Sequence, residues 1–369
     1  MTPFSSKMYA MLPQNRTKFT GIAVLICVLF LLGYQGLNQR QYPMGVLDRE
    51  KVWPVTAKKD ISLAAHNRTL GFEKIYLINL PSRTDRLDWM TLLASLTNVE
   101  LTLQDGVNGS LVAEKAKPAG SNNLKPEQLG CWRSHADVWQ RMVTENVTSA
   151  IILEDDADWD VDVHNIFERL SRQMRQTKLR KLPPTAYEEE HAPYGLEWDM
   201  LYIGSCWDIP NKDNRPQHEV YDDPSAPNKN EMSGAYSSEL SDWGVHLTDE
   251  TRVRVLAPTW YSVCTVGYAV TLQGAKRLLY TVGNGKGLQG PVDLAIMSAI
   301  QNNLLSSLTL VPPPVVPWKT GTVSDSDIDD LTDTADKTPK GSESLRNSGK
   351  KALDPLLSGQ ASYNDLGKS

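Results

Sequence analysis

The stretch AIILEDDADWD at residues 150–160 joins four apolar residues to a run of acidic ones. The apolar residues 150–153 are few and rich in Ile, which is typical of a strand buried inside a sheet. Three carboxylates follow at once, at Glu154, Asp155 and Asp156. Ligands of open α/β sheets bind at the carboxyl ends of the strands. We therefore expect these carboxylates at a ligand site.

Strand and helix patterns alternate on both sides of this stretch. Other buried strands are predicted at 73–80, 198–204 and 261–272. A helix after the first strand spaces its apolar residues as on one helical face: Leu87, Met90, Leu93 and Ala94. Further helices are expected over 125–143, 274–282 and 290–301. The alternation predicts an α/β domain with a mostly parallel sheet and flanking helices.

Three stretches depart from this alternation. Residues 171–195 and 208–258 are polar and are expected as long insertions, either functional lids or disordered loops. Residues 321–369 have little apolar surface to bury, so they are predicted to form a disordered acidic and polar tail. The folded domain is therefore expected to cover 73–320.

The N-terminal part contains an uncharged apolar run. Residues 19–37 (FTGIAVLICVLFLLGYQGL) would span about 28 Å as a helix, close to the hydrocarbon core of a bilayer. Three basic residues precede the run, so 1–18 is predicted to be a cytosolic tail and 19–37 a signal-anchor. Residues 38–72 then form a stem. A cleaved signal peptide is the alternative, because the strongest apolar core is only about 14 residues long.

Composition limits the possible functions. The net charge of −6 and the pI near 5.6 argue against nucleic-acid binding. Of the four cysteines, Cys27 lies in the apolar run, which leaves Cys131, Cys206 and Cys264. One disulfide and one free thiol are possible among these three, and the pairing stays open. Sequons at Asn67, Asn108 and Asn146 agree with a lumenal domain.

The acidic cluster itself favours a hard cation. Adjacent carboxylates repel one another and resist desolvation, so Mn²⁺ or Mg²⁺ is a natural compensation. Glu154 and Asp156 have the D-x-D spacing of metal-dependent glycosyltransferases. A solvated strand end and a phosphohydrolase with Asp156 as nucleophile are alternatives. An EF-hand is excluded because Val161 and Phe167 occupy its Gly and Glu positions.

Four segments in order resemble glycosyltransferase family 25, in the form of a fungal-type single-pass membrane member. They are IYLINLPSRTDR (75–86), LGCWRSHADVW (129–139), AIILEDDADW (150–159) and YSVCTVGYAVTLQGAKRLL (261–279) with PVD (291–293). The family includes lipopolysaccharide and collagen galactosyltransferases. The resemblance implies a GT-A-like, Rossmann-type fold, a UDP-sugar donor (most commonly UDP-galactose), a divalent cation and inversion at the anomeric carbon. With the anchor, it implies a type II protein of the Golgi or ER membrane whose catalytic domain is lumenal.

The resemblance also assigns candidate roles. Glu154 and Asp156 are the predicted metal ligands. An inverting transferase needs a carboxylate to take the acceptor hydroxyl's proton, and Asp293 is the predicted base. Its alternative role is a helix cap. The predicted donor-binding residues are Asn79, Arg83, Arg86, Ser134, His135 and Asp155, each of which could instead serve the local structure.

The leading hypothesis is a metal-dependent transferase that moves a hexose from a UDP-sugar to a glycan or glycoprotein. A phosphohydrolase and a membrane-tethered, non-catalytic pseudo-transferase are the alternatives. Three tryptophans offer an acceptor platform or core packing: Trp207, Trp243 and Trp260.

Overall fold

The structure is a computed structural model that describes residues 60–213, 217–283, 288, 290–320, 323–324 and 339–362. The predicted cytosolic tail, the signal-anchor at 19–37 and the stem up to residue 59 lie outside the described residues. Within the described ranges, the structure contains no helix that is both long and apolar enough to cross a bilayer.

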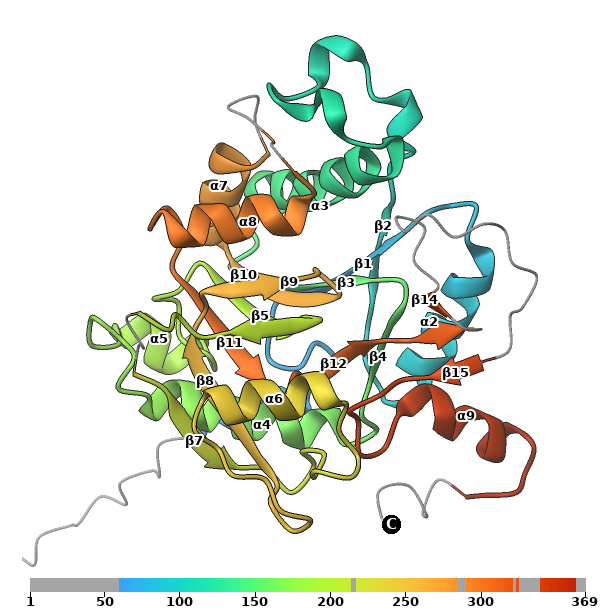
Figure 1. Ribbon diagram of the computed structural model, residues 1–369, viewed down its shortest axis with the longest axis vertical. Coiled ribbons are helices and arrows are strands. Elements are labelled where there is room, and N and C mark those ends of the chain that lie inside the picture. The colour runs from blue at the N-terminus through green and yellow to red at the C-terminus, as the bar shows by residue number, and fades with distance from the viewer. Residues whose placement is uncertain are drawn as a thin grey trace, which may run out of the picture. The chain divides into compact units, whose positions relative to one another are not determined.

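A mixed eight-stranded sheet forms the centre of the domain (Figure 1), in the order β2-β1-β3-β10-β5-β11-β8-β7. Six of the eight strands run in one direction, as predicted, whereas β10 and β8 run against them, and the sheet fits a GT-A-like fold. The strands are β1 (Lys74–Asn79), β2 (Thr102–Asp105), β3 (Ser149–Glu154), β5 (Met200–Gly204), β7 (Glu219–Asp222), β8 (Val253–Pro258), β10 (Gly267–Thr271) and β11 (Ser307–Val311).

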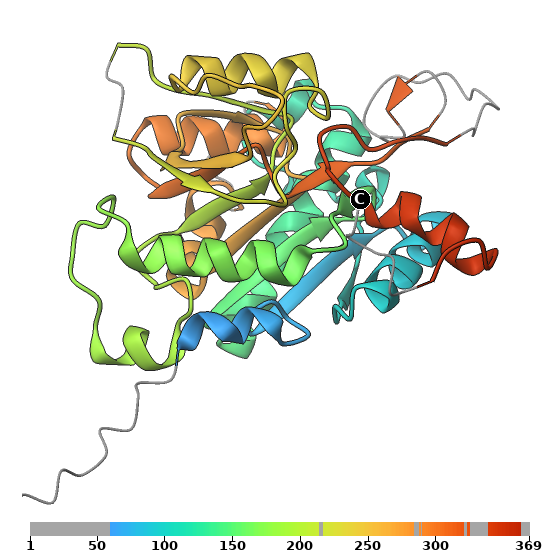
Figure 2. The same ribbon diagram turned by 90° about the horizontal axis from the view of Figure 1, so that it is seen from below.

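Both faces of the sheet are buried, which explains the continuous apolar runs of its strands. In β3, Ile151 and Leu153 enter one core while Ala150 and Ile152 enter the other. Figure 1 shows α3 (Pro126–Glu145), α7 (Leu272–Thr281) and α8 (Val292–Gln301) together on one side of the strands. The opposite core takes residues from α2 (Thr84–Leu96) and α4 (Val163–Gln176). Figure 2 shows η1 (Ile61–His66) beside α4.

The predicted apolar face of α2 is confirmed. Met90, Leu93 and Ala94 of α2 are buried, and Leu87 packs at the edge of the same core. The remaining short elements are η2 (Gly109–Leu111), η3 (Glu114–Ala116), η4 (Ser121–Asn123), α5 (Ala186–His191), β4 (Ala157–Trp159), β12 (Val315–Pro317), β13 (Lys319–Thr320) and β14 (Val323–Ser324).

The prediction of a single strand at 261–272 is wrong. The segment forms β9 (Tyr261–Val263) and β10, and Cys264 between them adopts φ +70°. Cys264 forms a disulfide with Cys206, and Cys131 keeps a free thiol. Strand β9 pairs instead with β6 (Trp207–Ile209) in a separate two-stranded ribbon. The disulfide thus holds the end of this ribbon beside the central sheet.

The long insertion predicted at 208–258 is also folded where the structure describes it. It supplies strands β7 and β8 to the central sheet and α6 (Gly234–Asp242). The apolar alternation at Val253, Val255 and Ala257 is the signal of a strand, and its polar surroundings concealed it. Buried Arg254 sits within that alternation because it is paired with Asp223. The 171–195 stretch contains the end of α4 and α5, rather than a continuous loop.

Part of the predicted disordered tail is ordered as well. Residues 339–362 contain β15 (Pro339–Gly341) and α9 (Gly349–Leu357), and α9 packs against α2. Leu345 and Leu353 are buried there. Few apolar residues suffice because the segment also supplies hydrogen-bond donors to Asp158, a fully buried carboxylate next to the acidic cluster.

Candidate active site

The acidic cluster lies at the carboxyl end of β3, as predicted. Glu154 is the last residue of that strand, and Asp155 and Asp156 form the turn into β4. Strand β1 runs parallel to β3, so the residues that follow β1 reach the same edge of the sheet. The three carboxylates have different partners, and each therefore has a different capacity to bind a ligand.

Asp155 serves the turn between β1 and α2. Its Oδ1 accepts from Arg86 Nη1 at 2.6 Å, and its Oδ2 accepts from Asn79 Nδ2 at 2.8 Å. Asn79 also donates to the backbone carbonyl of Arg83 at 3.1 Å. Burial raises the pKa of the Asp155 carboxyl, and the Arg86 guanidinium opposes that rise. Asn79, Arg86 and Asp155 are therefore brought together, and their mutual hydrogen bonds hold the turn; Arg86 and Asp155 also line the first cavity described below, whereas Asn79 lines neither cavity.

Glu154 faces helix α3. Its Oε1 lies 3.2 Å from His135 Nε2 and accepts from the Thr265 hydroxyl at 2.6 Å. The other ring nitrogen, His135 Nδ1, lies 2.8 Å from the hydroxyl of buried Tyr268. Burial opposes ionisation of Glu154, yet His135 and Thr265 bring its pKa below the usual value. Glu154 is therefore held as a carboxylate in a fixed orientation.

Asp156 is the carboxylate of the three that keeps an oxygen available for a ligand. Within the described residues, its Oδ1 is buried and makes no hydrogen bond. Its backbone oxygen accepts from Trp318 N at 2.8 Å, which fixes the turn. Burial, followed by the charge of Glu154, raises the pKa of Asp156 to about 7. A divalent cation would offset both the burial of the Asp156 carboxylate and its repulsion by Glu154. The residues present therefore fit the predicted hard-cation site.

Helix α3 approaches the loop after β2 very closely. A Cβ on Gly130 would lie 2.4 Å from the Val107 carbonyl oxygen, so a side chain is excluded there. Four residues on, Ser134 Oγ accepts from Val107 N at 2.8 Å and donates to the Gly130 carbonyl at 2.7 Å. Ser134 therefore tethers this loop to α3. This contact explains the four-residue spacing of Gly130 and Ser134 in the sequence.

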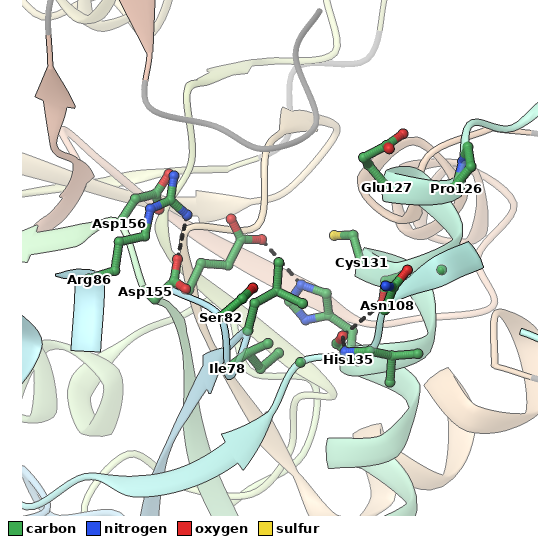
Figure 3. A pocket seen from close by; sticks show the side chains of 17 residues that line it. Ile78, Ser82, Arg86, Asn108, Pro126, Glu127, Cys131, His135, Asp155 and Asp156 are labelled. Carbon is green, nitrogen blue, oxygen red and sulfur yellow. Dashed lines mark hydrogen bonds and ion pairs between the residues drawn. The ribbon is translucent and has the colours of Figure 1, made fainter. Parts of the chain in front are cut away.

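Two cavities meet at the acidic cluster. The first, of about 440 Å³, lies between the turn after β1, the loop 106–109 and α3 (Figure 3). The second, of about 570 Å³, lies between the disulfide, the start of α8 and Lys319. Cys131, Glu154 and Asp156 line both. Predicted site residues lining the first cavity alone are Arg86, Ser134, His135 and Asp155.

Asp293 lines the second cavity, at the start of α8. Its Oδ2 accepts from Cys264 N at 3.0 Å, and its Oδ1 accepts from Leu294 N at 2.8 Å. The carboxylate therefore fixes both the helix start and the left-handed Cys264. The N-cap of α8 is Pro291, so Asp293 is not the helix cap; it lies in the first turn, accepts one backbone N–H there and also lines the cavity.

Three sequence predictions fare differently. Arg83 pairs with Asp85 at 2.9 Å and lines neither cavity. Trp243 is buried in a core with Leu240, whereas Trp207 on β6 is 44% exposed. Cys131 was not among the predicted site residues, yet it lines both cavities where they meet. The signal was its position one helical turn before His135.

Comparison with known proteins supports a family for part of the chain. Residues 72–193 match glycosyltransferase family 25 (LPS biosynthesis protein). The match covers about a third of the chain, including the acidic cluster but not Asp293. The chain is 25% identical over 237 residues to procollagen galactosyltransferase 1-B of Xenopus laevis, covering 61% of this chain and 30% of that protein.

Two further relatives show the same pattern. Procollagen galactosyltransferase 2 of Mus musculus is 26% identical over 238 residues, or 61% of this chain and 30% of that protein. The probable inactive glycosyltransferase 25 family member 3 of Bos taurus is 23% identical over 225 residues, or 57% of this chain and 29% of that protein. The chain thus spans about 30% of the length of these relatives, which include proteins described as inactive. The comparisons support a glycosyltransferase.

Proposed function

We propose that this chain is an active, metal-dependent member of glycosyltransferase family 25. It transfers a hexose from a UDP-sugar, and galactose is the hexose that we propose. The observation that carries the proposal is that Glu154 and Asp156 line both cavities. A transferase must bring two substrates to one reacting centre. Two cavities that share an acidic wall supply that arrangement.

The first cavity suits the donor. Arg86 and the residues of α3 that line it belong to the segment that matches the family. Glu154 and Asp156 would hold Mn²⁺ or Mg²⁺, which neutralises the charge that develops on a departing diphosphate. Among the described residues, Asp156 Oδ1 has no hydrogen-bond partner, and Glu154 is held in a fixed orientation; both observations support this assignment.

The second cavity suits the acceptor, a glycan or glycoprotein hydroxyl. As that oxygen attacks the anomeric carbon, the bond from this carbon to the UDP oxygen breaks and the hydroxyl proton passes to Asp293. The two backbone hydrogen bonds to Asp293 hold its carboxylate in one orientation, as a general base requires. The disulfide Cys206–Cys264 supports an oxidising compartment, in agreement with a lumenal domain of the Golgi or ER held by the 19–37 anchor.

The phosphohydrolase hypothesis is less well supported. It would use Asp158 as the second acid of a D-x-D pair. Asp158 is fully buried and accepts four hydrogen bonds within the chain: from Ser342, Ser348, Lys350 N and Trp159 N. It is therefore not available to a phosphate ester.

Incubating the full-length chain with UDP-galactose and Mn²⁺, with and without acceptor glycans, tests the proposal. We expect UDP release that rises with acceptor and stops when the metal is chelated. A pseudo-transferase would bind UDP without turnover, and a phosphohydrolase would release inorganic phosphate from p-nitrophenyl phosphate. Either result would contradict the proposal.

A further inference from the structure

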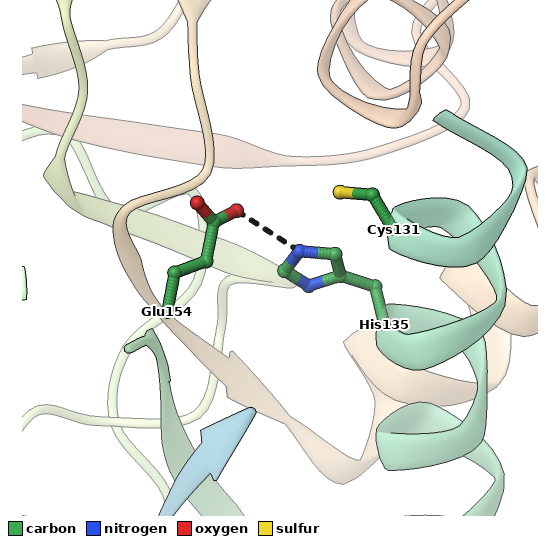
Figure 4. Close-up of side chains that lie close together, drawn as sticks. All are labelled: Cys131, His135 and Glu154. Atoms are coloured by element: carbon green, nitrogen blue, oxygen red, sulfur yellow. Dashed lines mark hydrogen bonds and ion pairs between the residues drawn. The ribbon is translucent and has the colours of Figure 1, made fainter. Parts of the chain in front are cut away.

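Cys131, His135 and Glu154 form a compact group at the wall that the two cavities share. One ligand atom from each lies within 4.8 Å of the other two (Figure 4). Cys131 and His135 come from successive turns of α3, and Glu154 faces them from the end of β3. Among the residues that the structure describes, these three form the one group of at least three Cys, His or acidic side chains that lie close enough together to hold a metal ion.

The ligand types differ from those of the hard-cation pair. Mn²⁺ and Mg²⁺ favour oxygen ligands, whereas a thiolate, an imidazole and one carboxylate suit Zn²⁺. Bond lengths of about 2.0–2.3 Å in a tetrahedral zinc site place ligand atoms roughly 3.3–3.8 Å apart. The three side chains need to close by only about 1–1.5 Å at most, within the reach of small rotamer adjustments.

The surrounding hydrogen bonds would support a bound metal. Tyr268 OH lies 2.8 Å from His135 Nδ1, so Nδ1–H can donate to it while Nε2 faces Glu154. Thr265 donates to Glu154 Oε1 and fixes the carboxylate. Such partners orient metal ligands and set their affinity. Three protein ligands and an open side toward the cavities are the arrangement of an accessible zinc site, not of a closed structural one.

We propose that Cys131, His135 and Glu154 form a second metal site, which takes a borderline-soft ion such as Zn²⁺ and shares Glu154 with the hard-cation pair. Binding replaces the thiol proton of Cys131, which passes to solvent. Two divalent cations that share the Glu154 carboxylate lie close together and repel each other, so zinc at this site would weaken Mn²⁺ binding and inhibit Mn²⁺-dependent transfer. That consequence rests on the proposed function, whereas the site itself does not.

Cobalt(II) is the probe, because it replaces Zn²⁺ and gives a thiolate charge-transfer band in the near ultraviolet when sulfur is a ligand. We expect the full-length chain, purified without metal, to bind one Co²⁺ with such a band, and Zn²⁺ to abolish it. Cys131→Ser should lose the band while keeping its circular dichroism spectrum, and Cys131→Ala serves if the serine variant does not fold. Cys27→Ser and Asp156→Asn are matched controls that should keep the band.

Three results would overturn the site: no cobalt binding, binding without the charge-transfer band, or a band that persists in the folded Cys131 variants. All are independent of catalysis, so they are distinguishable from a failure of UDP release. In a chain that does transfer sugar, Zn²⁺ should inhibit the wild type at least about tenfold more strongly than Cys131→Ser, since one of three ligands is gone. Equal inhibition would contradict the competition.

Discussion

Replacing Ser342 by alanine tests whether the C-terminal segment is part of the folded domain. Ser342 Oγ donates to Asp158 Oδ2 at 2.7 Å, and both residues are buried. Alanine removes this donor and adds no atom that could clash. The carboxylate would keep Ser348, which donates to the same oxygen at 2.5 Å. The variant therefore isolates one hydrogen bond between the C-terminal segment and the acidic strand.

The expected cost follows from the charge and burial of the acceptor. A hydrogen bond to an ionised group contributes about 1.5–3 kcal/mol, more than a neutral one. Burial raises the pKa of Asp158, and the Ser348 hydroxyl and the Lys350 ammonium oppose that rise. We therefore expect Ser342→Ala to lower the free energy of unfolding by about 1.5–3 kcal/mol near neutral pH. The corresponding fall in Tm is roughly 3–10 °C.

Urea unfolding followed by tryptophan fluorescence measures this change, as a lower midpoint with an unchanged m-value. Ser358→Ala is the matched control. Ser358 is exposed at the end of α9, and its loss should change stability by less than about 0.5 kcal/mol. If Ser342→Ala were as stable as the control, residues 339–362 would not be docked on Asp158, and the account of this segment would be wrong.

Three other changes test the site and its support. Burial raises the pKa of Asp208 to about 7 and that of Glu239 to about 8. Their contribution to stability is therefore full below about pH 4 and is lost progressively as the pH rises from about 4 to 7–8. Tm should fall between these pH values, and Asp208→Asn should make the fall smaller. Gly130→Ala places a Cβ 2.4 Å from the Val107 oxygen, and we expect a loss of about 1–3 kcal/mol in urea unfolding together with weaker UDP binding by calorimetry. Asp293→Asn keeps only one acceptor for its two backbone donors, so it should lose about 1–3 kcal/mol of stability, keep UDP affinity and lower transfer by about 10²–10⁴-fold. A flat Tm profile in the wild type, an unaffected alanine variant or normal transfer by the asparagine variant would refute the corresponding argument.

Local patterns predicted the half of the domain that resembles the family. The continuous apolar run before Glu154 and the predicted helix around His135 are strong signals, and both are confirmed. The resemblance assigned Asn79, Arg86 and Asp155 to one donor site, and in the structure they meet because the parallel strands β1 and β3 bring their carboxyl ends to one edge. Sequence alone did not show that their hydrogen bonds are largely internal.

The failures have a common physical cause, which is stabilisation by distant polar partners. Strand β8 contains buried Arg254, which is paired with Asp223, the residue that follows β7. The segment around Ser342 and Ser348 has few apolar residues, yet it is ordered by a buried carboxylate far away in the sequence. Cys264 ended a predicted strand because its disulfide and Asp293 favour a left-handed backbone there. Periodicity carries no information on such pairings.

The central claim is that Asp156, with Glu154, holds a divalent cation at the junction of donor and acceptor cavities. The most direct measurement is the rate of UDP release from UDP-galactose in the presence of Mn²⁺, for the wild type and for Asp156→Ala. Removing this carboxylate takes away a buried charge without a hydrogen-bond partner at Oδ1 among the described residues, so the variant should fold. We predict a fall of at least about 100-fold in the rate. A folded Asp156→Ala protein that releases UDP at a near-normal rate, and still does so with chelator present, would contradict the account.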